Sequence, residues 1–167
     1  MILISATTLE KTYENEGVQT RALIGATFTI EKGEFLAIMG PSGSGKSTLM
    51  QVLGLLDRAT GGSYQLDGKE VSQFSDDELA RLRNRKIGFV FQFHYILAEF
   101  SCLWNVMIPA LKLGKLCEKE IEQRAYQKLE ILGLKDQALK PASKLSGGQQ
   151  QRVAIARALI NDPLIIM

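Results

Sequence analysis

The sequence predicts an α/β fold in which a buried strand leads through a glycine-rich loop into a helix. The strand is expected at residues 35–39, because the run Phe-Leu-Ala-Ile-Met has no polar side chain and such runs are typical of parallel strands buried on both faces. Glycine and serine dominate the loop at 40–45. From Lys46 onward, apolar residues recur at helical spacing, which predicts a helix of about ten residues. The side chains expected on its buried side are Leu49, Val52, Leu53 and Leu56.

Length and composition are those of one ordinary globular domain. The chain has 167 residues, 46% hydrophobic and 23% charged, which allows a real core but not two domains. Its net charge of +2 gives no electrostatic argument for nucleic acid. Cys102 and Cys117 form neither a metal-binding pair nor a disulfide framework, which favours a reducing compartment. No apolar run reaches the roughly 18 residues of a membrane helix, and residues 1–9 lack the basic start of a signal peptide. We therefore expect a soluble protein that reaches membranes only through a partner.

The N-terminal third is expected to be mostly β-structure. Residues 3–13 are predicted to be extended and to end in a polar turn at 14–17. Apolar and polar side chains alternate from Ala22 to Ile30, as in a half-buried strand. A further short strand is expected at 63–66, followed by a turn at 67–68.

The rest of the chain is expected to be mainly helical. Ser75 is placed as the N-cap of a charged helix over 76–85, acidic in its first turn and basic in its last. A short apolar strand is expected at 87–91, and a last buried strand begins at Leu164. Between them, the hydrophobic periodicity predicts helices over residues 103–113, 119–132 and 147–160.

The loop at 40–48 satisfies the phosphate-binding pattern of a glycine-rich loop closed by Lys and Ser. Its residues are Gly40, Pro41, Ser42, Gly43, Ser44, Gly45, Lys46, Ser47 and Thr48. The glycines allow backbone N–H groups to turn inward around a phosphate, and the helix start adds the positive end of its dipole. Lys46 is expected to reach the β- and γ-phosphates, and Ser47 to coordinate Mg²⁺. The alternative is an ordinary Gly/Ser-rich turn that happens to match.

A second glycine-containing motif opens the last predicted helix. Residues 145–152 read Leu-Ser-Gly-Gly-Gln-Gln-Gln-Arg, with a serine at the N-cap and two glycines that leave amides free for an anion. Taken alone, this motif is equally a plain capped helix. Together with the loop at 40–48, it resembles the signature motif of ABC ATPases. The matching residues are Ser146, Gly147, Gly148 and Gln149.

The resemblance to ABC ATPases extends along the whole chain. Tyr13 stands where the family has an aromatic residue that stacks on adenine, Gln92 matches the glutamine of the Q-loop, and residues 164–167 resemble the start of the Walker B strand. The ATPase subunits of lipoprotein-release and macrolide-export transporters are the most similar branches. The segments that carry this likeness are 53–57, 82–85 and 88–92. The run at 91–95, followed by Asn105 and Val106, favours the lipoprotein-release branch.

The resemblance implies one partial ABC ATPase domain over residues 1–167, an α/β fold with a P-loop NTPase core, an antiparallel β-subdomain and a helical insertion. Residues 1–91 would hold the β-subdomain and the P-loop core, 92–145 the helical subdomain, and 146–167 the signature helix and the start of the Walker B strand. In the family this strand ends in an Asp that orders Mg²⁺ and a Glu that polarises water, and a switch histidine follows. The sequence stops at Met167, before these positions. The core sheet is therefore expected to be incomplete at the C-terminus, and the 167-residue polypeptide alone is expected not to hydrolyse ATP.

The resemblance also implies ligands and partners. ATP and Mg²⁺ would bind at 40–48, with Tyr13 on the adenine and with Ser47 and Gln92 near the metal. The signature of one subunit would contact ATP held by the other in a head-to-tail dimer. A transmembrane permease would hold the ATPase at the cytoplasmic face of the inner membrane. No nucleic-acid partner is expected.

Simpler interpretations stand beside these roles. Tyr13 is otherwise a core aromatic, and Gln92 a solvated loop residue. His94 is assigned a surface or packing role, because the family's switch histidine lies after Walker B. The aromatic stretch at 93–104 is either core of the helical subdomain or an exposed groove for a permease helix. In that stretch, the residues that depart from the family pattern are Ala98, Cys102 and Trp104.

Two other functions compete with that of a transporter ATPase. DNA-maintenance ATPases share these motifs but separate them by long coiled coils or zinc insertions, whereas the insertion between Gln92 and Leu145 is compact. A non-catalytic fragment is the other alternative. In the family, the membrane partner normally selects the transported substrate.

Overall fold

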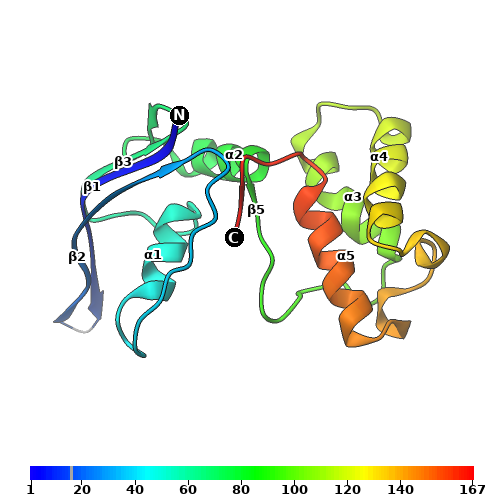
Figure 1. The fold of residues 1–167 in the computed structure, drawn as a ribbon, viewed down its shortest axis with the longest axis horizontal. Helices are drawn as coiled ribbons and strands as arrows, with labels where there is room; N and C mark the ends of the chain where they lie inside the picture. Colours follow the sequence, from blue (N-terminus) through cyan, green and yellow to red (C-terminus); the bar gives the residue numbers. More distant parts are fainter. Residues whose placement is uncertain (16) are drawn as a thin grey trace. The chain divides into compact units, whose positions relative to one another are not determined.

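The computed structural model describes residues 1–15 and 17–167, which form two compact units. The first unit comprises residues 1–80 and the second residues 81–167, with the division inside helix α2, Asp76–Lys86. In Figure 1 the first unit runs from blue to green and the second from green to red.

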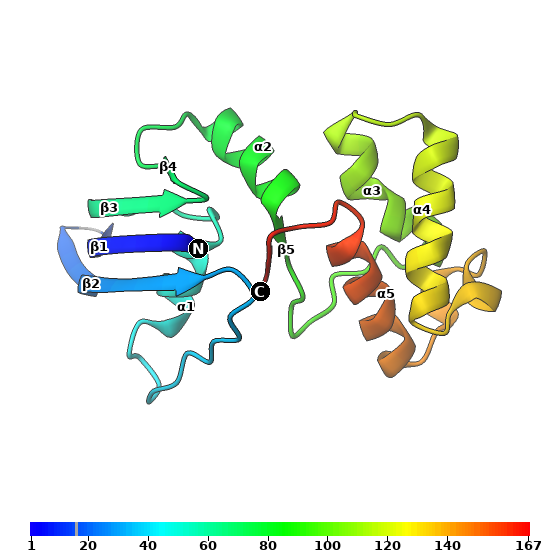
Figure 2. The ribbon, with the colours of Figure 1, turned by 45° about the horizontal axis from the view of Figure 1, so that its top comes forward.

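The first unit is built on a four-stranded antiparallel sheet in the order β2-β1-β3-β4. Its strands are β1 (Ile2–Asn15), β2 (Val18–Glu31), β3 (Gly61–Leu66) and β4 (Lys69–Glu70). Figure 2 shows β1 between β2 and β3. The predicted strands at 3–13, 22–30 and 63–66 are thereby confirmed. The turn predicted at 14–17 includes Glu16, which lies outside the described residues.

Helix α1 (Lys46–Leu53) supplies Val52 and Leu53 to the core of this unit. The prediction that Leu56 would be buried is wrong, since Leu56 is exposed and Leu55 is buried in its place. The helix ends at Leu53 and the backbone of Leu55 turns to a φ of 56°, so the helical spacing no longer sets which side chain faces inward. The hydroxyl of buried Tyr64 donates to the Leu53 carbonyl at 2.7 Å and closes this helix end.

The buried parallel strand predicted at residues 35–39 is not formed. These residues have no regular structure, and Phe35 and Met39 are 97% and 87% exposed. A strand needs neighbours to pair its backbone groups, and no strand in the described part of the chain pairs with this run. An apolar run alone therefore did not suffice to make a strand.

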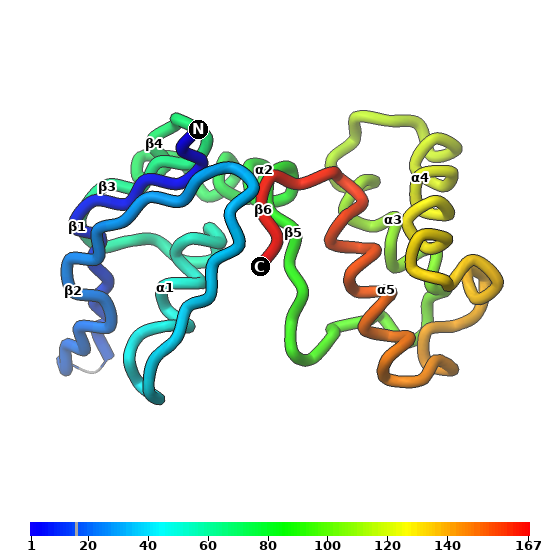
Figure 3. Tube along the Cα trace, viewed as in Figure 1, coloured from blue at the N-terminus to red at the C-terminus, as the bar shows by residue number. Residues whose placement is uncertain are grey.

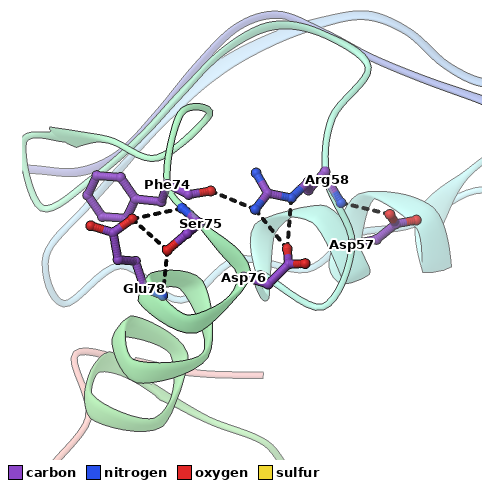
Figure 4. Close-up of polar contacts among 6 residues, drawn as sticks. All are labelled: Asp57, Arg58, Phe74, Ser75, Asp76 and Glu78. Carbon is purple, nitrogen blue, oxygen red and sulfur yellow. Dashed lines mark hydrogen bonds and ion pairs between the residues drawn. The ribbon is translucent and has the colours of Figure 1, made fainter.

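Helix α2 begins as its sequence predicts. The Ser75 hydroxyl accepts the Glu78 N–H at 3.3 Å, and the Glu78 carboxylate accepts the Ser75 N–H at 2.8 Å. This reciprocal pair is a capping box, which satisfies two N–H groups that the first helical turn leaves without partners. Figure 4 shows the pair at the helix start.

The second unit is a helical cluster. Helices α3 (Cys102–Leu113), α4 (Glu118–Ile131) and α5 (Gly147–Leu159) pack around one apolar core, as predicted from their periodicity. Short 3₁₀ turns at Lys135–Gln137 and Ala142–Lys144 lead from α4 to α5. Val106, Ala125 and Val153 are fully buried, one from each helix.

A short parallel pair of strands completes the second unit. Ile87–Gly88 (β5) pairs with Ile165–Ile166 (β6), and Figure 3 shows the two side by side. Both strands are shorter than the predicted 87–91 and 164–167, although the bond from Val90 N–H to the Met167 carbonyl continues the ladder at 2.7 Å. Gly88 permits the close approach, because a Cβ there would lie 2.4 Å from the Ala158 carbonyl oxygen.

Candidate nucleotide-binding site

The loop at 40–48 has the backbone geometry of a phosphate cradle. Gly45 is the N-cap of α1 with φ of 83°, and a Cβ on it would lie 2.4 Å from the Ala22 carbonyl oxygen on β2. Gly43 also has a positive φ, 78°, and a Cβ on Gly40 would lie 2.8 Å from the Ser44 hydroxyl. Glycine is therefore required at position 45 by conformation and by contact. The N–H groups of the first turn of α1 have no helical partners and are available to an anion.

Lys46 folds back over this loop. Its ammonium donates to the Pro41 carbonyl at 2.5 Å and to the Ser44 hydroxyl at 3.3 Å. Both acceptors are neutral, so an anion in the loop would offer the ammonium a stronger charge-assisted bond. The Ser47 side chain beside it is exposed. The loop residues thus fit the polyphosphate of a nucleotide, and Ser47 is free to contact a metal held by it.

Tyr13 lies on β1 and reaches the helix that follows the loop. Its hydroxyl donates to Asp57 at 2.9 Å and also forms a hydrogen bond with the Thr48 side chain. Burial, and then the bond to Asp57, raise the pKa of the Tyr13 hydroxyl, which therefore stays a donor. The structure thereby brings Tyr13 and the end of the loop together within the first unit. The assignment of Tyr13 to adenine stacking stays a prediction.

Two residues beside Tyr13 were missed by the sequence analysis. The Lys11 ammonium donates to Asp57 at 2.6 Å and lies over the Tyr13 ring, 4.8 Å from its centroid. Burial would raise the pKa of the Asp57 carboxyl, but hydrogen bonds from Lys11, Tyr13 and the Arg58 backbone hold it below its usual value. Lys11 and Tyr13 are two residues apart on one strand, so their side chains share a face of the sheet. This spacing is the feature of the sequence from which their contact could have been predicted. Asp57 had no such local signal.

Gln92 belongs to the second unit, where it is exposed just beyond β5. The proposed metal contacts Ser47 and Gln92 therefore lie in different units, and a joint site stays a prediction. Among the described residues, no group of three or more His, Cys, Asp or Glu side chains is placed to hold a metal ion.

The segment after Gln92 is held by two side chains, Asn105 and Arg157, for which the sequence predicted no structural role. Asn105 is fully buried, and its amide accepts from Leu97 N–H at 2.8 Å and donates to the Leu97 carbonyl at 3.0 Å. From α5, Arg157 donates to the carbonyls of His94 and Tyr95 at 2.6 and 2.7 Å. Burial lowers the pKa of the Arg157 guanidinium. This segment is therefore tied to the same helix that carries the signature motif.

The aromatic side chains of this segment are exposed. Phe93 and Tyr95 are 71% and 67% exposed, and Phe100 stacks beside Trp104 at 6.5 Å between ring centroids. The segment borders a pocket of about 340 Å³ lined by Gln92, His94 and Gln150, among others. These exposures favour the groove over the core interpretation. His94 is half-buried, and its backbone carbonyl is one of the Arg157 acceptors, which agrees with a packing role.

The signature motif forms the capped start of α5. The Ser146 hydroxyl accepts the Gln149 N–H at 3.4 Å, and the Gln149 side chain accepts the Ser146 N–H at 2.9 Å. Gly147 and Gly148 have open space around them, since a Cβ on either would meet no atom within 4 Å. Neither packing nor a positive φ within the described chain demands glycine there. The glycines thus leave room for a group from outside this chain to approach the helix start.

No helix in the described ranges 1–15 and 17–167 is both long and apolar enough to cross a bilayer.

The sequence is similar to that of known proteins over most of its length. The family model for ABC transporters matches residues 23–167. The chain is 53% identical over 144 residues to the lipoprotein-releasing system ATP-binding protein LolD of Aquifex aeolicus, covering 86% of this chain and 64% of that protein. It is 48% identical over 164 residues to the macrolide export ATP-binding/permease protein MacB of Chlorobaculum tepidum, covering 98% of this chain and 25% of that protein. The chain thus spans less than two thirds of the length of either relative.

Solved structures show the same fold. An ATP-binding cassette determined as a dimer in a post-hydrolysis state with ADP and Pi superposes with a TM-score of 0.87 at 41% identity, covering 98% of this chain and 72% of that one. CbiO1 of Clostridium perfringens, part of the ABC transporter complex CbiONQ, superposes with a TM-score of 0.83 at 32% identity, covering 99% of this chain and 64% of that one. The expected α/β P-loop fold and the similarity to the lipoprotein-release and macrolide-export branches are confirmed.

Proposed function

Because this chain belongs to the ABC transporter ATP-binding family, we propose that it is the nucleotide-binding part of a subunit that couples ATP to the work of a membrane permease. Lipoprotein release or macrolide export are the branches whose ATPases it most resembles among the relatives described above. The single observation that carries the proposal is the loop at 40–48, where Gly45 allows close backbone approach and Lys46 turns its ammonium over the cradle.

We infer that Mg²⁺ binds together with the nucleotide. When bound, the ion would supply charge neutralisation between the β- and γ-phosphates. On this chain, Ser47 would contact it from the first turn of α1, and the assignment of Gln92 to the metal stays a prediction. The exposed Ser47 hydroxyl supports this assignment.

Ser47→Ala tests the metal role. The variant is expected to bind ATP without metal as well as the wild type does, and to lose most of the gain in affinity that Mg²⁺ gives. Calorimetric titration with ATP in Mg²⁺ and in EDTA measures the difference. Ser42→Ala is the matched control, since its side chain is also exposed in the loop but lies before the helix. An equal gain from Mg²⁺ in Ser47→Ala and wild type would contradict the assignment.

We further infer that two copies of the subunit sandwich ATP head to tail. The open space at Gly147 and Gly148, at the start of helix α5, supports contact with a phosphate bound by a second copy. The dimeric cassette described above supports the same assembly. A two-fold dimer of this kind buries the same surface on both copies.

The exposed aromatic segment at 93–104 is the proposed docking surface for a permease at the cytoplasmic face of the membrane. Exposed aromatic side chains are enriched at protein interfaces. Hydrogen exchange should show slower exchange in this segment when the whole protein is bound to the permease with which it copurifies. Residues 118–131 on the outer helix α4 serve as the internal control. Unchanged exchange at 93–104, with protection appearing elsewhere, would place the permease on another surface.

A further inference from the structure

Three donors converge on the carboxylate of Asp57. Lys11 Nζ lies 2.6 Å from Oδ1, the Arg58 backbone N–H 2.7 Å from the same oxygen, and the Tyr13 hydroxyl 2.9 Å from Oδ2. Lys11 is only 8% exposed, and its ammonium has a second acceptor, the Arg58 carbonyl at 2.9 Å. We call Lys11, Tyr13, Asp57 and Arg58 the Asp57 cluster. All four residues belong to the first unit, so the cluster depends on no contact between units.

The Asp57 cluster is anchored at a second point. The guanidinium of Arg58 donates to Asp76 at 2.8 and 3.1 Å and to the Phe74 carbonyl at 2.6 Å, as Figure 4 shows. Asp76 is the first residue of α2, which the Ser75 capping box holds in place. The loop that carries Asp57 is thereby fixed between strand β1 and the start of α2.

This anchoring restricts Tyr13 in two ways. Its hydroxyl is held by Asp57 and Thr48, which limits the rotation of the side chain. One face of its ring is taken by the Lys11 ammonium, 4.8 Å from the centroid, so a further stacking partner has only the opposite face. A side chain already held in one orientation loses less conformational entropy when a ligand binds to it.

We propose that Asp57 and Lys11 are positioning residues for the nucleotide base, which hold the Tyr13 ring so that the base stacks on the face away from Lys11. This proposal rests on the proposed function, because it needs a nucleotide with its phosphates at 40–48, and on the stacking of its base on Tyr13 that the resemblance to ABC ATPases implies. The base is recognised by its π-face, and no residue of the Asp57 cluster belongs to the loop at 40–48 that would hold the phosphates. Loss of the cluster should therefore weaken binding of a whole nucleotide and leave binding of a bare polyphosphate unchanged.

Tyr13→Phe tests the proposal, because it keeps the aromatic ring and removes only the hydroxyl, with its bonds to Asp57 and Thr48. Calorimetric titrations of this chain with ATP and with tripolyphosphate, both with Mg²⁺, separate base binding from phosphate binding. We expect Tyr13→Phe to bind ATP about fivefold more weakly, because the ring must then be ordered when the base binds, and to bind tripolyphosphate as the wild type does. Asp57→Asn should show the same pattern, and Tyr13→Ala should lose about tenfold or more for ATP alone. Tyr126→Phe in α4 is the matched control and should change neither titration.

Two results would overturn the proposal. If Tyr13→Phe binds ATP as tightly as wild type while Tyr13→Ala does not, the ring stacks on the base without needing to be held by Asp57. If Tyr13→Phe weakens ATP and tripolyphosphate equally, the Asp57 cluster is purely structural. Failure of the proposed function looks different: the wild-type chain would then bind neither ligand, or Lys46→Ala would bind both as well as wild type does. Because Tyr13→Phe leaves the Lys11–Asp57 pair intact, the test does not depend on whether Asp57→Asn folds.

Discussion

Lys46→Ala is expected to weaken nucleotide binding by about 1.5–3 kcal/mol, roughly a 10- to 150-fold rise in Kd. The variant removes the Lys46 ammonium that folds over the loop, where it rests on the Pro41 carbonyl and the Ser44 hydroxyl. In the nucleotide complex this ammonium would exchange neutral acceptors for phosphate oxygens, and that gain is lost with the side chain. Calorimetric titration with ATP or ADP measures the change.

The control for this experiment is another lysine of the same unit. Lys69 on the short edge strand β4 is exposed, so Lys69→Ala makes the same change in net charge away from the loop. It should leave Kd within about twofold, because long-range attraction between exposed charges is screened at physiological salt. Lys46→Ala with an unchanged Kd would refute the phosphate-binding assignment.

Asp57→Ala is expected to lower the free energy of unfolding of the first unit by about 3–4 kcal/mol. The substitution leaves the Lys11 ammonium, whose side chain is 10% exposed, with the Arg58 carbonyl as its acceptor. Breaking a buried ion pair from one side costs more than removing both partners, because the remaining charge stays desolvated. The double variant Lys11→Met/Asp57→Ala should therefore recover most of the loss. Urea denaturation followed by hydrogen exchange of the β1 amides measures the unfolding of the first unit alone.

An exposed ion pair in the same unit provides the comparison. Lys32 and Asp67 lie 3.2 Å apart with side chains 43% and 32% exposed, so Lys32→Met should cost less than about 1 kcal/mol. A loss of unfolding free energy of similar size in Asp57→Ala and Lys32→Met would show that solvent screens the Lys11–Asp57 pair as it does an exposed pair. Equal instability of the single and double variants would show that the cost comes from Tyr13 or Arg58 instead.

The Lys11–Asp57 pair also makes the stability of the first unit depend on pH. The pKa of Asp57 is lower in the folded protein than its usual value, so its stabilising contribution is present above the unfolded pKa and is lost as pH falls through the folded one. The difference in stability between wild type and Asp57→Ala should therefore be largest near neutral pH and should shrink in acid. A difference that stays constant into acid would mean that the charge of Asp57 contributes nothing.

Features set by a few neighbouring residues could be predicted from the sequence. The loop at 40–48 needs only glycines with positive φ and a helix start directly after it, and both are present. The capping boxes at Ser75 and Ser146 are closed by residues three positions away. Each of the helices α3 to α5 is predicted by the spacing of apolar residues within its own segment. In each case the interaction that decides the structure is local, so its pattern is visible in the sequence.

Only the tertiary structure decides the contacts between residues that lie far apart in the chain. Lys11 and Asp57 are 46 positions apart, and Arg157 reaches back 63 positions to His94. No periodicity links such residues, because their distance depends on how strands and helices pack together. Residues 35–39 are the opposite case: their composition suits a buried strand, yet no described strand pairs with them and Phe35 lies in solvent. Local sequence sets the preference of a segment, whereas hydrogen-bond partners and covering side chains from elsewhere decide whether that preference is realised.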